Sequence, residues 1–120
     1  YYFKHNFYAD DGMIPAVIAA SLISQSNIPL SERIKPYKKY YKSGEQNFKV
    51  KNRDAVLQRI EKTYSEEQKE RVDGITIKFK EGWFNIRKSN SEPVVRLNVE
   101  ADSEGDLQKI LSQAKRHINV

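Results

Sequence analysis

The sequence contains no cysteine, which excludes disulfide bonds and thiolate chemistry. It also lacks a long hydrophobic run. Its most apolar stretch, residues 13–23, is interrupted by Pro15 and Ser21 and is shorter than the about 20 residues that span a bilayer. No charged segment followed by an apolar run marks a signal peptide. We therefore expect a cytoplasmic protein with no membrane partner, and because it begins with Tyr1, a processed chain or a piece of a longer one.

The composition is that of a small basic domain. The chain has 120 residues, 31% of them charged, and a formal net charge of +5. This length is enough for one compact domain and little more. The positive charge favours anionic partners, namely phosphates, nucleic acid or a membrane surface, and does not choose among them.

The first part of the chain predicts an apolar helix. Asp11 can cap a helix that begins after Gly12, and Pro15 lies early enough in it to be tolerated. Residues 13–23 are apolar on nearly every face, which is typical of a helix inside a larger core. The chain offers little else to bury this helix, so we infer that its native surroundings lie upstream, outside this chain. Without its cover, this helix is predicted to self-associate, to fold onto the following domain or to fray.

Residues 28–42 are predicted to be a linker that docks on the next domain. A helix is expected from residue 30 to 41, with a break allowed at Pro36. The lysines and tyrosines between Lys35 and Lys42 could bind nucleic acid, because lysines contact phosphates and tyrosines stack on bases. At helical spacing they separate onto different faces, which favours a solvated basic face above an apolar stripe.

Residues 43–120 predict one α+β domain with the element order β-α-β-β-β-α. The expected strands are 46–51, 75–79, one beginning at Trp83, and 94–101, and the helices begin at Asn52 or Asp54 and at Ser103. Three clearly alternating strands imply an antiparallel sheet with both helices covering one face. The other face is expected to be polar with no aromatic row, and to carry Thr76, Lys78, Asn85, Arg87, Arg96 and Asn98.

The most informative segment is the polar loop between the last two strands, residues 87–93. Arg87 can offer a planar fork to two oxygens of a phosphate, and Ser89, Asn90 and Ser91 can add neutral donors. The backbone of such a turn can also aim successive N–H groups at one anion. An ordinary polar hairpin turn explains the same composition equally well, so both interpretations stay open at this point.

The remaining polar residues predict no catalytic apparatus. His5, Asp10 and Asp11 lack metal-ligand spacing, and helix capping explains the carboxylates, so no metal site is predicted. No Ser/His/Asp or Cys/His arrangement and no glycine-rich phosphate loop is present in the sequence.

Residues 87–93, Arg-Lys-Ser-Asn-Ser-Glu-Pro, resemble the R-x-S-N-T-E-P phosphate-binding loop of the α-D-phosphohexomutases, with Ser91 in place of the usual threonine. The surrounding motifs also agree, in the order expected for the end of the third domain and the whole fourth domain of a bacterial phosphomannomutase/phosphoglucomutase. These motifs are Tyr8-Ala9-Asp10-Asp11-Gly12-Met13-Ile14-Pro15, Ser43-Gly44-Glu45 and Asp73-Gly74-Ile75. The fold implied is a TATA-box-binding-protein-like domain at 43–120. Residues 1–27 would then be the helical C-terminal remnant of the preceding α/β domain, and residues 28–42 the linker.

The resemblance implies a mechanism in which a phosphoserine exchanges phosphoryl groups with a hexose phosphate through a bisphosphate intermediate. Arg87, Ser89, Asn90 and Ser91 would hold the phosphate that is not reacting, and Lys88 would point away. The phosphoserine, the Mg²⁺ site and the sugar-selecting loop would lie outside this chain, which is expected to have no catalytic residue and no activity alone. The implied partners are mannose 1- and 6-phosphates, with glucose 1- and 6-phosphates as further candidates, and the other domains of the same enzyme. The alternative is a basic nucleic-acid-binding β-sheet module.

Overall fold

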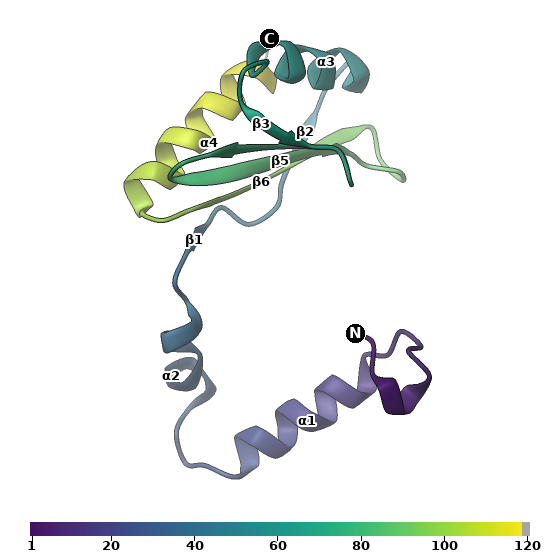
Figure 1. Ribbon diagram of the computed structural model, residues 1–120, viewed down its shortest axis with the longest axis vertical. Helices are drawn as coiled ribbons and strands as arrows, with labels where there is room; N and C mark the ends of the chain where they lie inside the picture. The colour runs from purple at the N-terminus through teal and green to yellow at the C-terminus, as the bar shows by residue number, and fades with distance from the viewer. Residues whose placement is uncertain (119–120) are drawn as a thin grey trace. The chain divides into compact units, whose positions relative to one another are not determined.

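The computed structural model describes residues 1–118, which form two compact units, Tyr1–Lys38 and a second one from Lys39 onward (Figure 1). The first unit is helical. Its elements are the 3₁₀ helix η1 (Lys4–Asn6), α1 (Met13–Ser24), α2 (Leu30–Ile34) and the 3₁₀ helix η2 (Lys35–Tyr37). A single antiparallel bridge joins Tyr2 to Asp10. Within residues 1–118, no helix is both long and apolar enough to cross a bilayer.

Helix α1 begins where the sequence predicts. The Asp11 carboxylate accepts a hydrogen bond from the Ile14 N–H at 2.8 Å, which satisfies one of the free donors of the first turn. No residue of α1 is buried, and the side chains of Met13 and Val17 are 73% and 64% exposed. The apolar helix is therefore only partly covered within its own unit.

The linker helix is shorter than predicted. Regular α-helix ends at Ile34, and the 3₁₀ turn that contains Pro36 ends at Tyr37, because proline has no N–H to continue the helix. The expectation of a helix to residue 41 is wrong. Tyr41 and Lys42 instead form a short strand, β1, that pairs with the last strand of the sheet. The separation of lysines and tyrosines onto two helix faces therefore does not apply beyond Tyr37.

The second unit is an antiparallel sheet of six strands in the order β1-β6-β5-β4-β3, with β2 also paired to β6. The predicted order of four strands and two helices is present, and two short strands, β1 and β3, were not expected. The bounds are β1 (Tyr41–Lys42), β2 (Gln46–Lys49), α3 (Arg53–Thr63), β3 (Gln68–Glu70), β4 (Ile75–Phe79), β5 (Gly82–Lys88), β6 (Val94–Ala101) and α4 (Glu104–Ile118).

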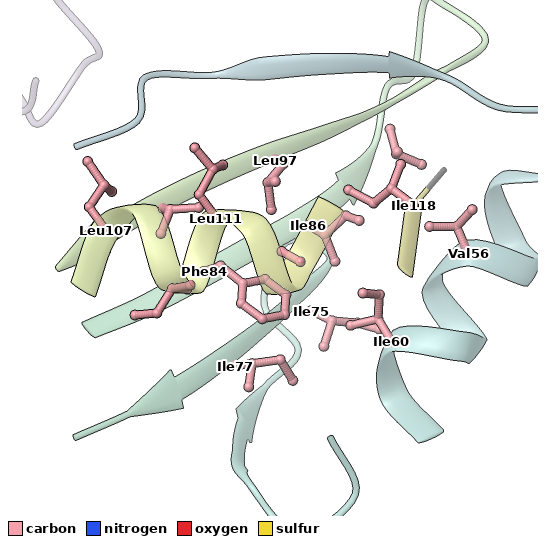
Figure 2. Packing of buried hydrophobic residues seen from close by; sticks show 14 of the residues in the cluster. Val56, Ile60, Ile75, Ile77, Phe84, Ile86, Leu97, Leu107, Leu111 and Ile118 are labelled. Carbon is pink, nitrogen blue, oxygen red and sulfur yellow. The ribbon is translucent and has the colours of Figure 1, made fainter. Parts of the chain in front are cut away.

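Both long helices of this unit contribute to one hydrophobic core on one face of the sheet, as predicted (Figures 1 and 2). Phe84 of β5 is fully buried, as are Ile60 of α3 and Ala114 of α4. Val95, Leu97, Val99 and Ala101 of β6 all point into this core, which confirms the predicted alternation of that strand. Because the two helices cover this face, the polar side chains of the strands occupy the other one.

Candidate functional site

The polar face of the sheet is built from cross-strand rows of side chains. Residues paired across neighbouring antiparallel strands lie on the same face, so the register places Arg87 beside Arg96 and Asn85 beside Asn98. The next row places Trp83 beside Glu100. The predicted polar residues of this face are therefore brought together. The expectation overlooked Trp83, which shares the face because it is two positions before Asn85 on a strand of period two.

Arg87 lies near the end of β5, with its guanidinium held by two carboxylates. Its Nη1 donates to Asp73 Oδ2 and its Nη2 to Glu45 Oε2, each at 2.9 Å. These hydrogen bonds, that to Glu45 above all, raise the pKa of Arg87, so the group keeps its charge. Its side chain is 33% exposed. Each Nη carries two hydrogens, so the guanidinium retains free donors for a further anion.

Glu45 lies between two arginines. One carboxylate oxygen accepts from Arg87, and the other lies 3.5 Å from Nη1 of Arg96. The Arg87 hydrogen bond, followed by the charges of Arg96 and Arg87, lowers the pKa of Glu45 against the opposing effect of desolvation. Arg96 also donates to Glu92 at 3.3 Å. These carboxylate partners were not predicted, because they come from separate segments with no shared motif.

The loop that follows β5 is closed by its own hydrogen bonds. Ser89 is buried, its N–H donates to the Val94 carbonyl at 3.0 Å, and its Oγ accepts from the Glu92 N–H at 3.3 Å. The hydroxyl proton of Ser89 remains available, since a hydroxyl can accept and donate at once. Asn90 and Ser91 are exposed at the turn. Of the four predicted site residues, Arg87 lies on the polar face, Asn90 and Ser91 lie at the exposed turn, and Ser89 lies inside it.

Lys88 points away from the polar face. Its Nζ donates to Asp54 Oδ1 at 2.7 Å, in the first turn of α3, the helix that covers the other face. That hydrogen bond and the lysine charge lower the pKa of Asp54. The expectation that Lys88 does not share the side of Arg87 is confirmed.

Gly74 allows the chain to approach the backbone of Arg87 closely. Its φ is +78°, and a Cβ built there would lie 2.2 Å from the Ile86 carbonyl oxygen and 2.7 Å from the Arg87 Cβ. Any side chain at this position would therefore collide with the strand that carries Arg87. Gly74 thus sets the position of Asp73 against the guanidinium.

A hollow of about 640 Å³ lies on the polar face beside Arg87. Asp73, Thr76, Trp83, Asn85 and Asn98 are among its lining residues. The Asn85 amide already donates to the Asp73 carbonyl at 2.8 Å and to Thr76 Oγ1 at 3.0 Å, so it stiffens the wall of the hollow.

The carboxylates near the N-terminus have partners within their own unit. Asp10 accepts from the terminal amine of Tyr1 at 2.8 Å, and Asp11 caps α1 and accepts from the Asn6 amide at 3.3 Å. His5 is exposed on the 3₁₀ helix η1. Among residues 1–118, no group of three or more His, Cys, Asp or Glu side chains could hold a metal ion.

Comparison with known families matches residues 45–117 to the model of the phosphoglucomutase/phosphomannomutase C-terminal domain. The chain belongs to this family. The match begins at Glu45, and it contains the segment 87–93 and the residues that hold Arg87. The family named by the loop resemblance is thereby confirmed, as is the α+β fold class.

Proteins of similar sequence agree with this assignment. The chain is 36% identical to a phosphomannomutase of Methanocaldococcus jannaschii over 98% of its length, and 41% identical to one of Vibrio cholerae over 84%. A solved phosphoglucomutase/phosphomannomutase family protein of Burkholderia thailandensis shares the fold, with a TM-score of 0.68 and 21% identity over 92% of the chain. The chain spans 26%, 23% and 24% of these three proteins, about a quarter of each.

Proposed function

We propose that this chain is the C-terminal part of a phosphomannomutase/phosphoglucomutase, an enzyme that interconverts hexose 1-phosphates and 6-phosphates. In this proposal the segment from Arg87 to Ser91 binds the phosphate of the substrate that is not reacting. Membership of the phosphoglucomutase/phosphomannomutase C-terminal domain family supports the proposal at the level of the domain. The role of the segment is supported by its geometry.

The observation that carries the proposal is a partly exposed cation next to an exposed polar turn. Arg87 keeps free guanidinium donors although Glu45 and Asp73 orient it. Within residues 1–118, the backbone N–H groups of Asn90 and Ser91, which follow Ser89, donate to no protein acceptor. A charged fork and unbonded turn amides are the donors that a phosphate dianion requires.

Binding through the phosphate suits a substrate that must react at both ends. A site that contacts the phosphate rather than the ring can hold a hexose phosphate in either orientation, and fixing the far end orders the reacting end. The chain alone is expected to bind hexose phosphates weakly and to catalyse nothing, because we place the phosphoserine and the sugar-selecting loop in other domains of the intact protein. Those domains are the proposed protein partners of this chain. We expect Mg²⁺ there too, where it would neutralise charge on the transferring phosphoryl group, and we assign none of its ligands to residues 1–118.

A nucleic-acid-binding module is the alternative. The positive charge and the sheet favour it, and Trp83 on the open face could stack on one base. Sheet platforms for RNA stack two or three bases on aromatic side chains. The paired positions on the strands next to Trp83 are Lys78 and Glu100, so its row offers no second ring. The phosphate-binding function is therefore favoured.

A backbone-amide NMR titration of this chain tests the proposal, with mannose 1-phosphate, inorganic phosphate and a short RNA as ligands. We expect shifts confined to residues 87–91, shared by both phosphates, even at millimolar affinity. Shifts caused by RNA alone, at residues 35–51 or around Trp83, would instead support the alternative. Saturable shifts with phosphate elsewhere on the chain would also reject the assignment.

A further inference from the structure

Arg53 ties together both ends of the turn that contains Asn90 and Ser91. It is the first residue of α3, directly after Asn52, whose side chain caps the helix by accepting from the Ala55 N–H at 3.0 Å. Its Nη1 donates to the carbonyl of Ser89 at 2.7 Å and to that of Glu92 at 3.1 Å. One nitrogen has two hydrogens, so it can serve both carbonyls at once.

Three backbone N–H groups of the same loop also have hydrogen-bond acceptors within residues 89–94. The N–H groups of Ser89, Glu92 and Val94 donate to Val94 O, Ser89 Oγ and Glu92 O, respectively. With the carbonyls of Ser89 and Glu92 held by Arg53, the unbonded amides of the described turn are those of Asn90 and Ser91. These are the amides that the proposed phosphate would contact.

We infer that Arg53 is a positioning residue that fixes the 89–92 turn in its anion-binding shape before the ligand arrives. The identity of the ligand rests on the proposed function, whereas the ordering of the turn does not. A turn of exposed polar residues that ordered only on binding would weaken binding by its lost conformational freedom, and hydrogen bonds made beforehand remove part of that cost. Arg53 does this from another element, without contact to the ligand.

Arg59 provides a matched control on the same helix. Its Nη1 donates to the carbonyl of His117 at 3.1 Å, so it is also a partly buried arginine that holds a backbone carbonyl. Arg53→Ala and Arg59→Ala therefore remove the same charge and the same type of contact from α3. Only the first removes a contact with the turn.

The test measures ¹⁵N heteronuclear NOEs of Asn90 and Ser91 without ligand, and then the affinity for inorganic phosphate by NMR titration. In Arg53→Ala we expect lower NOEs at these two amides and affinity weakened about tenfold, as expected when a pre-ordered loop is released. Arg59→Ala should stay close to the wild type in both. Arg53→Lys should restore most of both values, since a lysine ammonium can also donate to two carbonyls.

Two results would overturn the inference: NOEs unchanged in Arg53→Ala, or equal weakening of phosphate binding in both alanine variants, which would indicate a net-charge effect. Failure of the proposed function has a different signature. In that case the wild-type chain would bind no phosphate at residues 87–91, while the loss of order in Arg53→Ala would remain. Circular dichroism of each variant checks that the fold is retained. If the alanine variant does not fold, Arg53→Met supplies the test, because it keeps an unbranched apolar stem but has no donor for the carbonyls of Ser89 and Glu92.

Discussion

Arg87 and Arg96 lie directly opposite each other on β5 and β6, with the carboxylate of Glu45 between them. Two like charges paired across strands repel each other, and such pairs destabilise a sheet unless a counter-charge is present. Glu45 supplies that charge, and Asp73 and Glu92 add further carboxylates on either side. The arrangement keeps two arginines together on an open face, where an incoming phosphate would meet both their field and the free donors of Arg87.

Replacing Glu45 is expected to make the chain less stable at neutral pH. The pKa of Glu45 is lowered in the folded chain from a reference value of 4.5, so its ionised form stabilises the fold. That contribution is fully present above the unfolded pKa and is lost as the pH falls from there through the lower folded pKa. Glu45→Gln should therefore lower the unfolding midpoint in urea at pH 7, and the difference from wild type should disappear in acid.

Glu66→Gln is the control for that pH series, because the one hydrogen-bond partner of the Glu66 side chain in the described structure is the nearby Ser65 hydroxyl, at 3.4 Å. It should leave the midpoint nearly unchanged at each pH. A constant difference between Glu45→Gln and wild type from pH 7 down to pH 2 would contradict an electrostatic role for Glu45.

Removing the Arg87 guanidinium is expected to weaken phosphate binding selectively. A hydrogen bond to a charged group contributes about 1.5–3 kcal/mol, so Arg87→Ala should raise the dissociation constant for mannose 1-phosphate by about tenfold or more. In the intact enzyme that we propose, the same change should lower kcat/KM through the loss of several kcal/mol of transition-state binding. Isothermal or NMR titration measures the first effect, and steady-state kinetics the second.

Lys88→Ala is the matched control for Arg87. It removes the same charge one position further along β5, but from the side that faces Asp54. It should reduce phosphate affinity only slightly, by the loss of long-range field. Equal losses in the two variants would assign binding to net charge, and wild-type kcat/KM in Arg87→Ala would reject the site.

The sequence predicted the elements with strong patterns and missed those defined by their partners. The alternation of Ile75, Ile77 and Phe79 was sufficient to predict β4, and the apolar stripe of α4 was sufficient to predict that helix. An element that buries one face has apolar residues at regular spacing in its sequence. Strand β3, Gln68–Glu70, contains no apolar residue and exists through its pairing with β4. Short edge strands of this kind carry little pattern of their own.

The candidate site was predictable only in part for a similar reason. A loop motif is contiguous, so the segment from Arg87 to Ser91 could be found by inspection. The partners of its arginine, Glu45 and Asp73, come from the residue just before β2 and from the segment before β4. Ion pairs between segments far apart in the chain depend on strand order, which single-sequence patterns do not specify.

Alanine at Gly74 is expected to destabilise the chain and to displace Arg87. A non-glycine residue at positive φ costs roughly 1–2 kcal/mol, and here its Cβ would also collide with the backbone of β5. Gly44→Ala separates the two effects, because Gly44 has a similar φ of +66° but open space around it. Urea denaturation should give a loss of about 1–2 kcal/mol for Gly44→Ala and about 3 kcal/mol or more for Gly74→Ala. Equal losses would mean that the close approach to Arg87 has no energetic consequence.

Helix α1 is expected to drive self-association of this chain. None of its apolar side chains is buried within their unit, and Val17 and Leu22 are 64% and 52% exposed. A continuous apolar surface of this kind associates in water, because association removes it from solvent. The double variant Val17→Glu/Leu22→Glu should therefore shift the chain toward monomer in sedimentation velocity runs over a range of concentrations.

The control places the same charges on polar positions of α1, as Ser21→Glu/Ser24→Glu. These serines make only local contacts, with Ser24 donating to the Ser21 carbonyl and Ser21 accepting from Gln25. This variant should associate as the wild type does, because it leaves the apolar side chains in place.

If the wild-type chain is instead monomeric at every concentration, amide hydrogen exchange of α1 decides among the remaining cases. Fast exchange throughout α1 would mean that the helix frays, and protection lost in Val17→Glu/Leu22→Glu would mean that it folds onto the sheet domain. Protection retained in that variant would show that an uncovered apolar helix is stable in this chain, against the expectation.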